Sequence, residues 1–151
     1  MTHFISVFTT RLRLYTQDDL DAIVDGVNKP HLQKHVMMAG PLSRKQQQGW
    51  LEQVMEPTPT NKVFAVEAWD GALLGSMGLH QIDLINGTAT TGALLFNEEY
   101  LGRGYGTDAK FALLNWAFNA LPLRKVTSEV KATNPRSKAY QEKNGYTCIG
   151  T

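Results

Sequence analysis

Three glycines alternate with larger residues in the segment Leu101-Gly-Arg-Gly-Tyr-Gly-Thr107, just before a long apolar stretch. Glycine tolerates positive φ and lets the backbone approach a ligand closely. The apolar stretch predicts a helix over residues 107–121, and a helix N-terminus offers free amide donors and the positive end of the macrodipole. Residues 102–107 are therefore predicted to bind a phosphate group, and the Arg103 guanidinium would add a positive charge.

Three further polar residues could serve a reaction. Asn134 is followed by proline, which predicts a helix that Asn134 caps, and Ser137 falls in the first turn of that helix. The Ser137 hydroxyl could transfer a proton or could simply be a solvated helix serine. His80, near the end of a predicted strand, could act as a base near neutral pH, although a lone strand histidine is more often structural.

Two common phosphate-binding motifs do not fit the glycine segment. A Walker loop requires Gly-Lys-Ser/Thr at the helix start, where this chain has Gly106-Thr107-Asp108. A Rossmann fingerprint requires a third glycine further on and normally opens a βαβ unit. Here the segment follows a predicted antiparallel hairpin.

Hydrophobic periodicity and turn residues predict the elements that position these groups. A strand is expected at 11–15, and helices are expected after Thr16 and after Ser43, where Gln46 completes a capping box. Asp70-Gly71 and Asn86-Gly87 are hairpin turns. The helix at 107–121 is apolar almost all round and is therefore predicted to be buried. The other expected elements are strands at 62–69, 72–83, 88–96 and 124–130, a helix from 134 to 144, and a strand starting at 146–150.

The order of these elements predicts a single mixed α/β (α+β) domain over residues 1–151, and the composition is that of a globular protein. Hydrophobic residues make up 42% of the chain and charged residues 19%, as in globular proteins. The formal net charge of +1 predicts no nucleic-acid partner. The single cysteine, Cys148, cannot form an internal disulfide, and the N-terminal residues resemble neither a signal peptide nor a membrane span, so a cytoplasmic protein with no membrane partner is expected.

The segment Gly104-Tyr-Gly-Thr-Asp-Ala109 resembles the pyrophosphate-binding loop of GNAT acetyltransferases. Leu101 stands where that family usually has Gln or Arg, a departure that is common in the branch acetylating ribosomal-protein N-termini and spermidine. Asn134-Pro-Arg-Ser137 and Glu142-Lys-Asn-Gly-Tyr146 are similar to elements of the same branch. The likeness covers nearly the whole chain.

The resemblance implies a GNAT-like fold and acetyl transfer from acetyl-CoA to a primary amine, without a metal. It implies a V-shaped split between the strands at 88–96 and 124–130 that holds the pantetheine arm. It also implies that Ser137 acts as the catalytic acid. His80 is a candidate base for a different reason, because it is the only histidine near the expected cleft. The residues expected to bind the cofactor are Leu94, Leu95, Phe96, Leu101, Gly102, Arg103, Gly104, Tyr105, Gly106, Thr107 and Asn134.

The family's catalytic groups are only partly present. Many members place a tyrosine seven residues after the asparagine, where this chain has Gln141, and Tyr140 comes one residue early and is expected to point elsewhere. The family often has a glutamate before the glycine of the third hairpin strand, where this chain has Thr91. The base is therefore left open between His80 and water.

Two rival functions remain at this point. A non-catalytic acyl-CoA-binding or sensing module would explain Thr91 and Gln141, and a nucleotide-binding domain would explain the glycine segment alone. The acceptor, a small molecule or a protein N-terminus, is not selected, because the expected acceptor wall lies in the region 28–60. Family members continue past Tyr146 with two strands, whereas this chain stops at Thr151, so truncated C-terminal strands are expected. The sheet should then have an exposed edge, and because such an edge favours pairing with another chain, a homodimer is expected.

Overall fold

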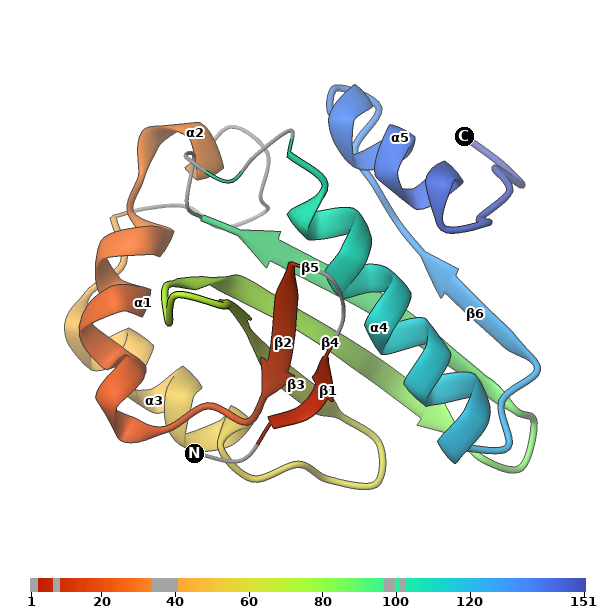
Figure 1. The fold of residues 1–151 in the computed structure, drawn as a ribbon, viewed down its shortest axis with the longest axis horizontal. Helices are drawn as coiled ribbons and strands as arrows, with labels where there is room; N and C mark the ends of the chain where they lie inside the picture. Colours follow the sequence, from red (N-terminus) through yellow and green to blue (C-terminus); the bar gives the residue numbers. More distant parts are fainter. Residues whose placement is uncertain (1–2, 7–8, 34–40, 97–99, 101–102) are drawn as a thin grey trace.

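The computed structural model describes residues 3–6, 9–33, 41–96, 100 and 103–151. They form a sheet of six strands in the spatial order β1-β2-β3-β4-β5-β6, with helices on both faces (Figure 1). The strands are β1 (His3–Ser6), β2 (Thr10–Arg13), β3 (Lys62–Ala68), β4 (Leu73–Asp83), β5 (Thr88–Leu95) and β6 (Lys125–Ser128). Neighbouring strands are antiparallel except β5 and β6, which are parallel.

The helices begin and end close to the predicted residues. Ser43 caps its helix with the predicted reciprocal bonds to Gln46, and Asn134 caps the last one. The region 28–41, expected to be irregular, contains a short helix in its described part. The helices are η1 (Gln17–Asp19), α1 (Leu20–Val27), α2 (Pro30–Gln33), α3 (Arg44–Val54), α4 (Tyr105–Ala120) and α5 (Pro135–Lys143).

Alternation along β3 separates two apolar layers, because successive strand side chains point to opposite faces. Phe64 and Val66 pack in one cluster with the inner face of α4. Ala65, between them, packs in another with α1 and α3. The sheet therefore has an α4 face and an α1/α3 face.

β5 and β6 separate part-way along their length. They pair from Thr88 opposite Lys125 to Thr91 opposite Ser128, and β5 then continues to Leu95 beyond the last of these pairs. The expected opening between the two strands is thus present. We call it the split and the Thr91–Ser128 pair its apex.

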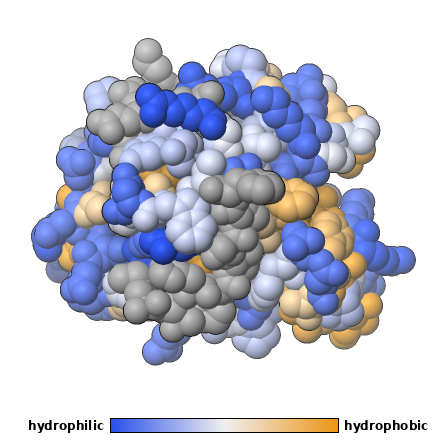
Figure 2. Space-filling model, in the orientation of Figure 1, coloured by the Kyte–Doolittle hydropathy of each residue, from blue (hydrophilic) through white to orange (hydrophobic). Residues whose placement is uncertain are grey.

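Two expectations about packing were wrong. Residues 146–151 form no strand. The Tyr146 amide donates to the Gln141 carbonyl at the end of α5, and its hydroxyl contacts the side chain, not the backbone, of Thr91 in β5. The helix α4 is not buried all round: Phe111 and Phe118 are 56% and 45% exposed. Figure 2 shows apolar side chains as a patch over the C-terminal half of α4.

Two classes of site or span are absent from the described part of the chain. No helix within it is both long and apolar enough to cross a bilayer. No three His, Cys, Asp or Glu side chains in it gather where they could hold a metal ion.

Candidate active site

The N-terminus of α4 has the geometry of an anion site. Gly104 is its N-cap with φ of 86°, and the first helical hydrogen bond is donated by the Asp108 amide, which leaves the amides of residues 105–107 without a helical acceptor. A side chain at Gly104 would meet nothing within 4 Å, so a ligand can approach this backbone closely. Arg103 is exposed beside it, whereas Leu101 and Gly102 lie outside the described residues.

The same helix end packs on the end of β5. A Cβ added to Gly106 would lie 2.8 Å from the Leu95 side chain, so a glycine is needed for this approach. The phosphate-binding geometry and the split are therefore joined by direct contact.

The backbone of β5 offers fewer free donors than the sequence suggested. The Phe96 amide donates to the Leu74 carbonyl at 2.9 Å, so it is not available to a ligand, and the Phe96 side chain packs against Gly26 of α1. Because consecutive strand residues direct their backbone groups to opposite edges, the Leu95 amide faces the split. Leu94 contributes its side chain to a cavity on the α1/α3 face.

This cavity has a volume of about 300 Å³. Its floor is kept open by Gly78 and Gly92, which lie opposite each other on β4 and β5. Polar groups come from Gln47, Ser76 and His80, and Trp50 supplies an aromatic wall. The other lining residues are largely apolar: Ile23, Val27, Leu42, Val63, Ala93, Leu94 and Phe96.

His80 lies over the glycine floor of this cavity. Its Nδ1 is 3.1 Å from the Asn61 Oδ1, which only accepts, so Nδ1 carries the proton and Nε2 keeps its lone pair. Positions that a Cβ would take on Gly78 and Gly92 lie 2.8 and 3.4 Å from Nε2. Burial, reinforced by the positive charge of Lys110, lowers the pKa of His80 below its usual 6.5. The imidazole is thus neutral at pH 7 and able to accept a proton.

The side chains of α5 are placed differently from the prediction. The Asn134 Oδ1 accepts from the Ser137 amide at 3.2 Å as expected of a cap, and the half-buried Ser137 hydroxyl hydrogen-bonds Tyr140. Tyr140 does not point elsewhere: it faces the Lys110 ammonium of α4, and burial raises its pKa to about 12. Gln141 is 7% exposed and donates to the Ser128 hydroxyl at the apex, while its Oε1 has no hydrogen-bond partner.

A buried cluster at the apex escaped the sequence analysis. It joins Lys110 of α4, Thr91 of β5 and Tyr146, whose hydroxyls and ammonium are in hydrogen-bond contact. A lysine set between apolar residues of a helix predicted to be buried was the signal that could have found it. Burial lowers the pKa of Lys110 to about 7.

Residues 10–147 match the family described as Acetyltransferase (GNAT) domain. The chain belongs to the GNAT acetyltransferase family. A Bacillus subtilis (strain 168) protein named as a ribosomal N-acetyltransferase, YdaF, is 33% identical over 86 residues, which are 57% of this chain and 46% of that protein. The alignment thus spans a little under half of that relative's length.

Solved structures share the GNAT fold. The spermidine N-acetyltransferase of Vibrio cholerae, solved with CoA and spermine, superposes with a TM-score of 0.81 at 21% identity, covering 93% of this chain and 82% of that one. A GNAT-family acetyltransferase from Bacillus anthracis gives a TM-score of 0.86 at 22% identity, covering 97% and 85%.

Proposed function

We propose that this GNAT protein transfers the acetyl group of acetyl-CoA to a primary amine. The observation that carries the proposal is the α4 N-terminus with its free amides, packed directly on the strand edge that opens into the split. A phosphate group and an extended arm are thereby held by adjacent parts of one surface, which is what a CoA thioester requires.

The residues present fit this cosubstrate. The pyrophosphate would lie on the amides of residues 105–107, with Arg103 beside it, and the Asn134 side chain flanks the start of α5. The pantetheine arm would pair with the Leu95 amide. The unpartnered Gln141 Oε1 is a buried acceptor for an N–H of the same arm. When bound, acetyl-CoA supplies an acetyl group activated as a thioester.

The acceptor amine would enter the cavity on the α1/α3 face. His80 Nε2 lies over Gly92, the first β5 residue beyond the apex, so the imidazole is placed to take a proton from an amine in that cavity. Asn61 holds the tautomer that leaves Nε2 free. We therefore assign His80 as the base.

The thiolate leaving group needs a proton on the other side. We assign the Ser137 hydroxyl as its donor, because Ser137 is half-buried in the first turn of α5 and hydrogen-bonded to Tyr140. Tyr140 in turn faces the apex cluster through Lys110, which links the Ser137 hydroxyl to the base of the split.

The cavity lining favours one kind of acceptor. Within the described residues that line it there is no carboxylate, and apolar side chains predominate. Polyamines carry several charges and need acidic partners, whereas a single amine next to apolar groups does not. We propose a primary amine with an apolar neighbouring group, such as the N-terminus of a protein.

The test is amine-dependent release of the CoA thiol from acetyl-CoA, measured across a panel of N-terminal peptides, spermidine and small primary amines. We expect release with peptides that begin with apolar or small residues and less with spermidine. Tight binding of acetyl-CoA without amine-dependent release would instead support the non-catalytic acyl-CoA module.

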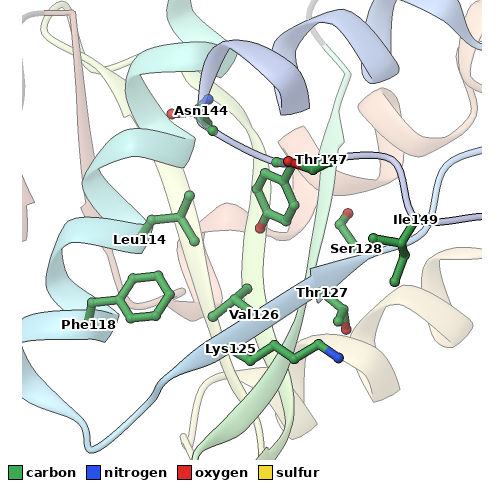
Figure 3. A pocket seen from close by; sticks show the side chains of 11 residues that line it. Leu114, Phe118, Lys125, Val126, Thr127, Ser128, Asn144, Thr147 and Ile149 are labelled. Atoms are coloured by element: carbon green, nitrogen blue, oxygen red, sulfur yellow. The ribbon is translucent and has the colours of Figure 1, made fainter.

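We also propose that the protein forms a homodimer through the β6 edge. A cavity of about 240 Å³ lies between α4, β6 and the segment 144–149, and Figure 3 shows Leu114 and Phe118 facing Val126 and Ile149 across it. Among the described strands, β6 pairs with β5 alone. Two copies related by a twofold axis would present this same surface to each other.

Light scattering over a concentration series tests the dimer. Phe118→Lys should give a monomer that still binds acetyl-CoA, because Phe118 lies far along α4 from the phosphate site. A wild-type protein that is monomeric at every concentration would contradict the dimer.

A further inference from the structure

Lys110 is the most deeply buried charged group of the apex. It is the sixth residue of α4, its side chain is 0% exposed, and its Nζ donates to the Thr91 Oγ1 at 2.8 Å. The rings of Tyr140 and Tyr146 have their centroids 5.8 and 5.5 Å from the same nitrogen. Hydroxyl and aromatic groups thus surround an ammonium group.

No carboxylate among the described residues forms an ion pair with Lys110. The titratable groups that face it are Tyr140 and Tyr146 from the side of α5 and, at longer range, His80 from β4. Burial without a counter-ion disfavours the charged form, and the pKa of Lys110 is about 7. The charge at the apex therefore changes near neutral pH.

The hydrogen bonds of the cluster depend on this charge. Tyr146 OH and Thr91 Oγ1 are 2.6 Å apart, and either can be the donor. A charged lysine only donates, so Thr91 accepts from Lys110 and its own proton is left for Tyr146. Tyr146 then accepts, and its phenolic proton is directed away from Thr91. With neutral Lys110 the chain can reverse, and Tyr146 donates to Thr91.

We propose that protonated Lys110 orients the Thr91–Tyr146 hydroxyl pair so that Tyr146 donates a hydrogen bond to the sulfur of CoA in the split. The proposal rests on the proposed function, because it places that sulfur near the apex. Thr91 is the last β5 residue paired with β6, so the hydroxyl pair lies where the split begins. Lys110 and Thr91 are positioning residues, and Tyr146 is the residue that touches the substrate.

A hydrogen bond to sulfur is stronger when the sulfur is a thiolate, so it stabilises the leaving group more than the thioester. It also lowers the pKa of the thiol of bound CoA. Neutralising Lys110 removes the orientation, so kcat at saturating acceptor should fall as pH rises through about 7.

The experiment measures kcat for release of the CoA thiol as a function of pH, at saturating acetyl-CoA and acceptor. At pH 6 we expect kcat of the wild type to exceed that of Lys110→Met at least about tenfold, and we expect the difference to vanish by about pH 9, where Lys110 is neutral. Tyr146→Phe should lose the same effect, and it serves if Lys110→Met folds poorly. The matched control is Lys138→Met, which removes an exposed lysine of α5 and should leave the pH profile of kcat unchanged.

The outcomes separate the inference from the proposed function. If the wild type releases no CoA thiol with any amine, both are overturned. If it does, and kcat has the same pH profile in the wild type, Lys110→Met and Tyr146→Phe, the orientation by Lys110 is wrong while acetyl transfer still stands. A structural role alone would lower the melting temperature of Lys110→Met without changing the pH profile of kcat, and that result too would overturn the orientation.

Discussion

A titratable group lies on each face of the sheet near the apex, and the two groups differ in burial and in hydrogen bonding. On the α1/α3 face, His80 is half-buried beside an apolar cavity, and a hydrogen bond to Asn61 leaves one ring nitrogen free. On the α4 face, Lys110 is fully buried, and its nitrogen is engaged with Thr91. Burial lowers the pKa of both groups. One can exchange protons with a visiting molecule, whereas the other acts on its neighbours.

The difference between the two groups matches two separate requirements of the proposed reaction. An acyl transfer must remove a proton from the nucleophile and stabilise the leaving group, and the two events occur on opposite sides of the reacting carbon. The accessible neutral base suits the first task, and the enclosed cation with its hydroxyl pair suits the second. The α4 N-terminus serves both, because it would hold the cosubstrate between them.

The largest effect is expected on acetyl-CoA binding, from a substitution at the α4 N-terminus that serves both faces. Gly104→Glu adds bulk and a negative charge beside the proposed pyrophosphate site, so acetyl-CoA should no longer raise the melting temperature. The loss of affinity should be about 10²-fold or more, because charge repulsion adds to the lost approach. Thermal melting with and without acetyl-CoA measures it.

Gly71→Glu is the matched control. Gly71 has φ of 91° in the hairpin turn before β4, and a side chain there also meets nothing within 4 Å. The two variants therefore carry the same backbone strain and the same added charge. If Gly104→Glu retains the stabilisation by acetyl-CoA that Gly71→Glu shows, the phosphate site lies elsewhere.

The next largest effect should fall on the acceptor face alone. His80→Gln keeps a polar side chain but removes the base, and kcat/KM for the acceptor should drop by about 10²-fold, with acetyl-CoA binding unchanged. Because the pKa of His80 lies below 6.5, wild-type activity should fall as pH drops through that lower value. The variant should lack this acid limb. If wild type and variant both simply gain rate with pH toward the pKa of the amine, no base acts and water takes the proton.

An effect of comparable size, on kcat rather than on kcat/KM for the acceptor, is expected from the hydroxyl of α5. Ser137→Ala should lower kcat by something like 10²-fold while the KM for acetyl-CoA changes little, because the hydroxyl acts on the leaving group. Tyr140→Phe should cost less, since it keeps the ring that faces Lys110. A crippled Tyr140→Phe with a normal Ser137→Ala would make Tyr140 the donor.

The sequence predicted the features that depend on residues close together along the chain. The caps at Ser43 and Asn134, the two hairpins and the glycine start of α4 follow from residue type and short spacing, and the structure has all of them. The split followed from family resemblance.

What the sequence did not predict depends on contacts between distant elements. Tyr140 was assigned by its rotation on α5, but which face of α5 is buried is decided by its packing against α4. Burial of Lys110 requires α4, β5 and Tyr146 to meet, over separations of 19 and 55 residues between Thr91 and its two partners. The exposed Phe111 looks like a core residue by composition alone.

The smallest expected effect is on the pH dependence of folding stability, and it concerns Lys110. In the unfolded chain Lys110 has its ordinary pKa of 10.5, and folding lowers it to about 7. Between these values the unfolded state binds more protons, so this lysine destabilises the fold fully below pH 7 and progressively less as pH rises toward 10.5. Lys110→Met should therefore melt a few degrees higher than wild type at pH 6, and the gain should shrink by pH 10. A gain that grows with pH would contradict a buried, unpaired ammonium.

The most direct test of the account is amide hydrogen exchange, resolved by residue with NMR, before and after addition of acetyl-CoA. The account predicts slower exchange at Leu95 on the split and at residues 105–107 of α4, and little change in the Asp70-Gly71 turn. Protection confined to other elements, or equal protection by ATP or NAD, would contradict the placement of acetyl-CoA in the split and with it the proposed acetyl transfer.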